Sequence, residues 1–201
     1  MATDSTTSLR NPLAPAPQPP CDLSTADLPA LLGRRMGADE VKQLARQASL
    51  SGEPIDHLAA LVGSDDARTA TNAAWVLTHC TDKSVARLAS QFDSLAERFL
   101  SATEEGRRRL LLHLLTRLDA GSEATRIQLL DACLATLADP SAAYGLRALS
   151  MQMAYRVAAP YDALRDELRR LLLALEPAEL SPGTRHTRRH ILQLLDSHSS
   201  R

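Results

Sequence analysis

Apolar residues recur every three or four positions along most of this chain, the spacing that gathers them on one face of an α-helix. The apolar stretches end at glycine, proline or polar clusters, where a helix is expected to stop. From residue 54 the stretches follow one another regularly and pair into units of about 38 residues. The pattern predicts eight helices in four pairs, over residues 54–81, 82–119, 122–159 and 160–197.

Helical pairs of this length cannot bury their apolar faces alone and are expected to stack on their neighbours. Two shorter predicted helices, over residues 24–32 and 38–48, precede the first pair. Residues 11–20 hold five of the eleven prolines, which favour an extended chain. We therefore expect residues 1–21 to form a disordered, proline-rich tail and residues 22–201 to form a single helical repeat domain.

The composition favours helices over strands. The 201 residues include 36 Leu and 32 Ala but only five Val and three Ile. Leu and Ala are good helix formers, whereas β-branched residues prefer strands. Aromatic residues make up 3% of the chain, so the core must consist of many small aliphatic contacts. This composition argues against a sheet-built enzyme.

The turns within the helical pairs carry a more specific signal. Asp65-Asp66-Ala67-Arg68 recurs loosely at residues 181–185, and a capping residue followed by an arginine in the next helical turn is typical of HEAT repeats. With the runs at 72–77, 148–151 and 181–192, the chain resembles a family of small, uncharacterised bacterial HEAT/ARM-like proteins. The resemblance spans roughly residues 50–195 and implies an all-α fold, an α-α superhelix (HEAT/ARM-like solenoid) of about four helical pairs.

Some members of that family are labelled adenylosuccinate lyase. The Ser-bearing signature loop of that enzyme is not found in this sequence, so the resemblance supplies a fold and no catalytic residues. The eight glycines are scattered at predicted helix ends and turns and form no glycine-rich phosphate loop. We therefore expect no cofactor and no enzymatic activity.

Two arrangements resemble metal or nucleophile sites but lack the groups that such sites need. His186 and His190 share a helical face, yet Arg188 and Arg189 beside them repel a cation, and no acidic third ligand is indicated. Cys80 falls on a small apolar face, where a buried, inert thiol is expected. We predict no metal site.

The charge is nearly balanced, with a formal net charge of −1, whereas a dedicated nucleic-acid protein is usually strongly basic. Three arginines at 107–109 lie in the first turn of a predicted helix, where they form a solvated face or, alternatively, contact an anion or an acidic partner. The three cysteines have no ligand-like spacing, and no secretory signal or long apolar run is found. We expect a cytoplasmic protein that does not enter a membrane.

One predicted helix, over residues 67–80, carries polar residues and the single tryptophan away from its stripe of small core residues. In HEAT-type stacks the second helix of each pair lines the concave surface, so we expect a weakly basic groove with Trp75 as an aromatic anchor. The alternative is that Trp75 fills a seam between repeats. The predicted partner-binding residues are Arg68, Asn72, Trp75, His79, Arg109, His113, Arg117, Arg147, Met151, Arg185 and Arg189.

These observations predict a non-enzymatic cytosolic binding module or scaffold, whose concave face holds a protein or peptide segment and whose arginines contact acidic groups. Four repeats form a short arc, which suits a small partner. Two alternatives stay open. One is a nucleic-acid-binding HEAT-like protein similar to DNA-repair proteins, which the charge disfavours; the other is a small-molecule enzyme, as the lyase label implies.

Overall fold

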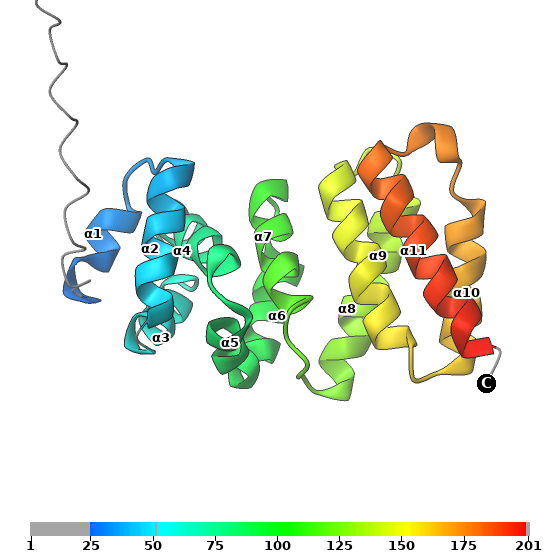
Figure 1. Cartoon of the computed structure of the whole chain (residues 1–201), viewed down its shortest axis with the longest axis horizontal. Coiled ribbons are helices and arrows are strands. Elements are labelled where there is room, and N and C mark those ends of the chain that lie inside the picture. Colours follow the sequence, from blue (N-terminus) through cyan, green and yellow to red (C-terminus); the bar gives the residue numbers. More distant parts are fainter. Residues whose placement is uncertain (1–24, 51, 200–201) are drawn as a thin grey trace, which may run out of the picture.

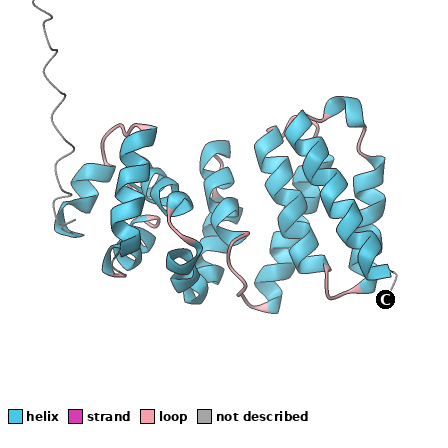
Figure 2. Cartoon of the chain, in the orientation of Figure 1, coloured by secondary structure: helices cyan, strands magenta, loops and turns pink. Residues whose placement is uncertain are grey.

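The computed structural model describes residues 25–50 and 52–199, and every regular element in this part of the chain is helical (Figure 2). The helices follow one another along the long axis of the molecule, from α1 at one end to α10 and α11 at the other (Figure 1). All four predicted pairs are present, which confirms the all-α solenoid. The expected tail, residues 1–21, lies outside the described residues.

Eleven α-helices and three 3₁₀ segments make up the described chain. The 3₁₀ segments are η1 (Thr25–Asp27), η2 (Ala86–Gln91) and η3 (Pro177–Glu179). The α-helices are α1 (Leu28–Leu32), α2 (Ala38–Leu50), α3 (Glu53–Leu61), α4 (Ala67–His79), α5 (Asp82–Val85), α6 (Phe92–Ser101), α7 (Glu105–Leu115), α8 (Glu123–Ala138), α9 (Tyr144–Ala158), α10 (Asp162–Ala174) and α11 (Pro182–Ser199).

The second helices of the four pairs, α4, α7, α9 and α11, form one row, which we name the inner row. Each packs against the next, and α1 packs against α4. The other helices form the outer row. In this row α8 and α10 both contact α9 of the inner row, and a pocket of about 400 Å³ lies between α8 and α10. Successive helices of the inner row contact one another more extensively than those of the outer row, as expected for the inside of a solenoid's curve.

Side-chain caps set where the inner helices begin. The carboxylate of Asp66 accepts a hydrogen bond from the Thr69 backbone N–H at 2.8 Å, and the hydroxyl of Ser181 accepts one from the Thr184 N–H at 3.2 Å. These caps satisfy first-turn N–H groups that have no partner within the helix. Both lie in the turn motif that the sequence singled out.

One predicted helix is interrupted. The apolar stripe from Val85 to Phe99 predicts a continuous helix, whereas the structure contains α5, η2 and α6. Gln91 adopts φ −101° and ψ 7°, outside the α region, before α6 begins at Phe92. A 3₁₀ turn of three residues still returns Leu88 to the same side as Val85, so both are buried.

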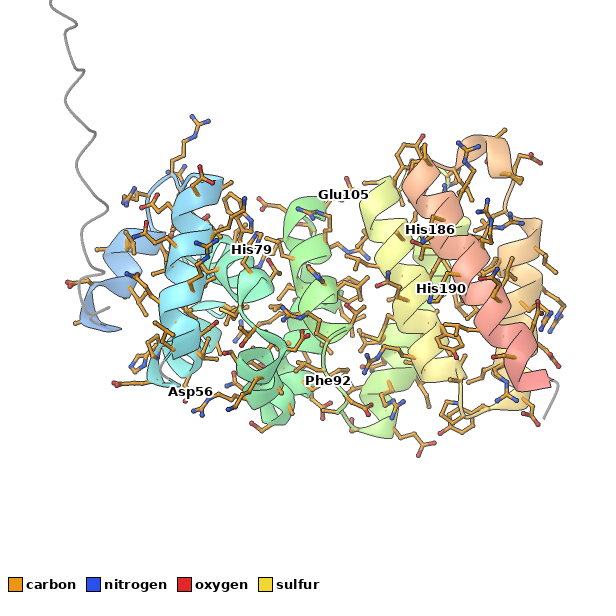
Figure 3. The ribbon with its side chains drawn as sticks, viewed as in Figure 1. Asp56, His79, Phe92, Glu105, His186 and His190 are labelled. Atoms are coloured by element: carbon orange, nitrogen blue, oxygen red, sulfur yellow. The ribbon has the colours of Figure 1, made fainter. Side chains whose placement is uncertain are left out.

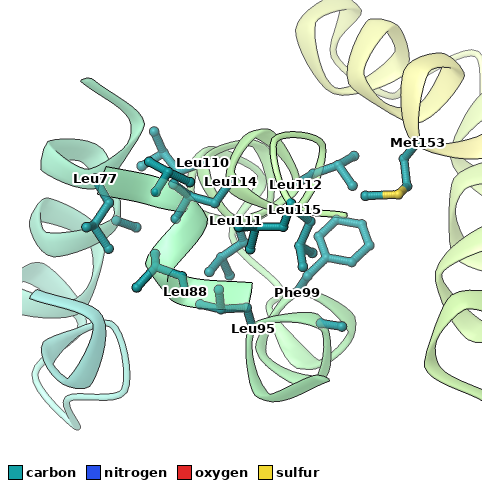
Figure 4. Packing of buried hydrophobic residues seen from close by; sticks show 14 of the residues in the cluster. Leu77, Leu88, Leu95, Phe99, Leu110, Leu111, Leu112, Leu114, Leu115 and Met153 are labelled. Atoms are coloured by element: carbon teal, nitrogen blue, oxygen red, sulfur yellow. The ribbon is translucent and has the colours of Figure 1, made fainter. Parts of the chain in front are cut away.

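The core is a continuous series of small aliphatic contacts. Figure 4 shows the leucines of α7 between Leu77 of α4, Phe99 of α6 and Met153 of α9. The predicted core stripe of α4 is confirmed, because Ala70, Ala73, Ala74 and Leu77 have no exposed surface. In contrast, Ile127, which the pattern of α8 assigned to the core, is 50% exposed and lines the pocket between α8 and α10.

Successive repeats are joined by side chains that donate to carbonyls of the repeat before. Asn72 donates to the end of α1, Arg117 to the residues that end α4, and Arg156 to those that end α7. Each donor lies 37 to 40 residues after its acceptors, which is the repeat spacing. The acceptors are the carbonyl oxygens of Leu32 and Arg34, of Leu77, Thr78 and Cys80, and of Thr116 and Leu118.

Candidate functional site

Buried positions align the four helices of the inner row. Val76, Leu114, Met153 and Ile191 are buried and stand 38 or 39 residues apart. The residues immediately before them are half-buried or exposed, so they mark the open side of each helix. Adding the positions one turn before and after defines a surface that we name the inner face. Its residues are Thr71, Trp75 and His79; Arg109, His113 and Arg117; Ala148, Gln152 and Arg156; and His186, His190 and Leu194.

Trp75 is half-buried and packs against the hydrophobic core while part of its surface stays open. Trp75 is therefore neither fully exposed, as an anchor for a partner would be, nor fully buried between repeats. A partly exposed tryptophan that is already held by packing loses little conformational freedom on binding.

His113 of α7 lies among basic residues. Its pKa is lowered, first by burial of the imidazole and then by the positive charges of Arg117, Arg109 and His79. His113, Arg109 and Arg117 come from one repeat and His79 from the repeat before. Together they form one basic cluster on the inner face. Figure 3 shows His79 on α4, and it shows His186 and His190 on α11, further along the row.

The three consecutive arginines of α7 contact three different neighbours. Arg107 donates to the Val62 carbonyl oxygen at 3.3 Å, and the guanidinium of Arg108 lies 5.2 Å from the centre of the Phe99 ring. Arg109 is exposed and passes over Gly145 of α9, where an added Cβ would lie 3.3 Å from the Arg109 Cδ. Arg107 therefore contacts the preceding repeat, Arg108 packs on α6 within its own helical pair, and Arg109 alone belongs to the inner face.

Arg117 is committed to structural contacts. Its guanidinium donates to three carbonyl oxygens at the end of α4 and pairs with Asp82 at 2.7 Å, and the side chain is 17% exposed. Arg156 repeats the arrangement one repeat later and has Asp119 at 3.8 Å. Arg117 and Arg156 both place positive charge at the edge of the inner face, but most of their N–H donors already bond to acceptors within the protein.

Three predicted partner-binding residues are buried, which corrects the prediction. Asn72 is 8% exposed, Arg147 is 3% exposed and Met151 has no exposed surface. Asn72 is occupied in capping α1. For Arg147 and Met151 the cause is the repeat offset, which is 39 residues from α7 to α9 and not 38. A shift of one residue turns a position by about 100° around the helix, from the open side to the packed side.

The remaining predicted residues are exposed but do not all share one surface. Arg68 and His79 lie at the two ends of α4. Arg185 and Arg189 stand in register with Arg147 and Met151, so they lie on a different side of α11 from His186 and His190. They neighbour the inner face and are not part of it.

The sequence prediction missed Ala148, Gln152, His186 and His190. The register of the buried residues could have identified them. Gln152 and His190 each lie one residue before a buried apolar residue of the 38- or 39-residue series, and Ala148 and His186 lie one helical turn before those two. The spacing of the arginines alone predicts a different register, because Arg109 and Arg147 are 38 residues apart.

Charge is divided between the two rows. The four inner-row helices contain nine arginines and two acidic residues, Glu105 and Asp196. The outer-row α-helices α2, α3, α5, α6, α8 and α10 contain twelve acidic and eight basic residues. No inner-face position carries an acidic side chain. The near-zero net charge of the chain thus conceals an excess of arginines in the inner-row helices and an excess of acidic residues in the outer-row α-helices.

The other candidate chemistry is weak in the described residues. No three His, Cys, Asp or Glu side chains among them group to hold a metal ion. Cys80 and Cys133 are buried free thiols; burial raises the pKa of Cys80 and raises that of Cys133 to about 12, so both are poor nucleophiles. Within the same part of the chain, no helix has the length and apolar character needed to cross a membrane.

Comparison with known families agrees with the architecture. A search of curated proteins finds no match. Residues 29–195, which include α4 through α10 entirely, match the model of the HEAT repeat domain. The match covers most of the chain, and the stacked helical pairs and their spacing accord with it. The chain belongs to the HEAT repeat domain family.

Proposed function

We propose that this protein is a non-enzymatic binding module that holds an acidic protein or peptide segment along its inner face. The observation that carries the proposal is the division of charge between the rows: the inner-face positions are neutral or basic, while acidic residues concentrate in the outer row. Such a surface favours the approach and retention of negatively charged groups.

Unpaired arginines support this reading. Arg109 is exposed, and neither it nor Arg68 has a carboxylate within 4.0 Å among the described residues. By contrast, Arg117 and Arg156 at the edge of the inner face have Asp82 and Asp119 as partners. An arginine without a carboxylate keeps its planar donor set free for a bidentate contact to a partner's Asp or Glu.

Trp75 supplies the apolar part of the proposed contact. Tryptophan and arginine are the residues most enriched at the energetic centres of interfaces. Trp75 and the cluster around His113 lie on adjacent helices, so one partner segment can cover both. Four helices at about 8–10 Å spacing span about 25–30 Å, which corresponds to roughly eight or nine residues of extended chain.

A catalytic role has less support among the described residues. The shifted pKa values belong to buried thiols, to the capping carboxylates Asp66 and Asp139, and to His113. The capping carboxylates have pKa values lowered by hydrogen bonds from Thr69 and Ser141 within their own turns. We also infer a cytoplasmic location, because two buried thiols kept apart from one another suit a reducing compartment.

The test is a selection from a peptide library of mixed charge on the immobilised protein. Selected peptides should be rich in Asp and Glu, bind more weakly as salt rises, and change the fluorescence of Trp75, the only tryptophan. Trp75→Ala and Arg109→Gln should each weaken binding about tenfold or more. Arg46→Gln is the matched control, because Arg46 is an exposed arginine on outer helix α2.

Two outcomes would contradict the proposal. Selected peptides could lack acidic residues, or Arg46→Gln could weaken binding as much as Arg109→Gln. Duplex DNA provides a third arm: tight binding to duplex with a steep salt dependence would favour a nucleic-acid-binding function over the proposed one.

A further inference from the structure

A second, smaller site lies at the seam between the first two helical pairs, where α3, α4, α6 and α7 meet. A pocket of about 240 Å³ opens there, lined by Arg98 of α6, Arg107 of α7 and Ala67, the first residue of α4. Ser101 and Glu104 also line it. Its residues belong neither to the inner face nor to the pocket between α8 and α10.

The two guanidiniums of this pocket converge on the end of α3. Arg107 donates to the carbonyl oxygen of Val62 at 3.3 Å, and the Arg98 guanidinium packs so closely on Gly63 that a Cβ there would overlap it. Val62 and Gly63 are consecutive, so both positive groups contact the same short segment at the end of α3. Like charges at short range repel one another unless an anion lies between them.

The protein itself supplies little to balance this charge. Neither Arg98 nor Arg107 has a carboxylate within 4.0 Å in the described part of the chain. The Nε of Arg107 is buried and has no acceptor there. The C-terminal end of α3 attracts cations, but the one acceptor it provides is the Val62 oxygen. In the described part of the chain, the Arg98 guanidinium donates no hydrogen bond and that of Arg107 donates one, so both keep N–H donors unpaired.

The rest of the pocket also suits an oxyanion. Ala67 begins α4, whose N-terminal end favours negative charge, although the Asp66 carboxylate already caps this end. The Ser101 hydroxyl, which donates to the Arg98 carbonyl at 3.3 Å, adds a polar wall. Glu104 is the one acidic residue that lines the pocket, and it opposes an anion.

We propose that Arg98 and Arg107 form a binding site for a phosphate monoester, either a free phosphate compound or a phosphorylated side chain of a partner. The planar guanidinium matches two phosphate oxygens at once, and two guanidiniums together match a dianion. The pocket accommodates a single phosphate group. This site does not depend on the proposed role of the inner face, since it uses different residues.

The test is an NMR titration of the arginine side-chain Nε–H signals of the full chain with inorganic phosphate at constant ionic strength. The signals of Arg98 and Arg107 should shift in a saturable manner, while those of Arg46 and Arg170 should not. Arg98→Gln should weaken phosphate binding at least about tenfold, as expected when charged hydrogen bonds to an anion are lost. Arg46→Gln should leave it unchanged.

Two further variants sharpen the test without removing either arginine. Gly63→Ala should displace the Arg98 guanidinium and weaken phosphate binding, because the added methyl takes its place. Glu104→Gln should strengthen binding severalfold, since it removes the opposing charge. Arg98 is the primary site of substitution because it donates no hydrogen bond that holds repeats together, whereas loss of Arg107 could disturb the seam.

A serine peptide and its phosphoserine form distinguish the two sources of phosphate. Saturable shifts with phosphoserine peptide that exceed those with inorganic phosphate indicate a partner's side chain, and equal shifts indicate a free phosphate compound. Equal, non-saturating shifts of all arginines would overturn the proposal, as would unchanged phosphate binding by Arg98→Gln. In that case the two arginines would serve only to cap α3.

Discussion

Asn72 is predicted from the sequence to contact a partner, but its side chain stabilises the fold instead. Its amide donates to two carbonyl oxygens at the end of α1, 38 and 40 residues earlier in the chain. Arg117 and Arg156 make equivalent contacts in later repeats. Residue type alone does not separate these roles, because Asn and Arg suit both a carbonyl acceptor inside the protein and an acidic group on a partner.

Substitution of Asn72 by Ala should lower the free energy of unfolding by about 1–3 kcal/mol, because it leaves buried carbonyl oxygens without donors. Each kcal/mol lost should lower Tm by about 2–4 °C in a protein of this size. Chemical and thermal unfolding measure both. Thr71→Ala is the control, since the Thr71 hydroxyl donates only within its own helix. A variant Asn72→Ala as stable as Thr71→Ala would show that the cap contributes nothing.

His113 should titrate below the ordinary pKa of histidine, because burial and the neighbouring charges of Arg117, Arg109 and His79 disfavour its protonated form. The unfolded chain then takes up this proton at a higher pH than the folded chain. The stability contributed by neutral His113 is therefore present above the ordinary histidine pKa and is lost as pH falls through and below it.

NMR titration of the imidazole signals measures the His113 pKa directly. Between neutral pH and about pH 5, His113→Gln should lose less stability than the wild-type protein. A His113 midpoint at or above the ordinary pKa of histidine would refute this account of its surroundings.

At the scale of helices, the spacing of apolar residues predicted most elements, and capping residues predicted where several begin. Two features of the helices could not be predicted from the sequence. The break of the helix predicted from Val85 to Phe99 depends on the backbone at Gln91, which the apolar spacing does not reveal. The exposure of Ile127 depends on α10 leaving a pocket beside α8, a matter of packing between elements that are distant in sequence.

Gly121 holds the connection between α7 and α8 in a conformation that other residues rarely adopt. Its φ is +100°, and a Cβ there would overlap the ring of Phe92. Gly121→Ala should therefore cost about 1–3 kcal/mol of stability. Gly106→Ala is the matched control: Gly106 lies within α7, and an added methyl meets nothing within 4 Å, so that variant should be neutral or stabilised by up to about 1 kcal/mol. Denaturant unfolding compares the two, and equal stability of both variants would contradict the strain assigned to Gly121.

At the scale of the whole molecule, the repeat architecture could be predicted from the sequence, because period and apolar spacing are properties of the chain. The candidate site could be predicted only in part. Trp75, Arg109 and His113 do lie on one face, but the prediction aligned the third repeat one residue out of register and so chose Arg147 and Met151 in place of Ala148 and Gln152. The division of charge between the rows depends on which helices form each row, and the net charge of the chain does not reveal it.

The binding face itself is tested most directly by mapping a selected acidic peptide on the protein by NMR. The account predicts that the largest shifts of backbone and side-chain signals fall on the inner face, at Trp75, Arg109, His113, Gln152 and His190, and that they diminish as salt rises. Shifts that instead centre on Ile127 and Tyr161, in the pocket between α8 and α10, or that spread over both rows, would contradict it.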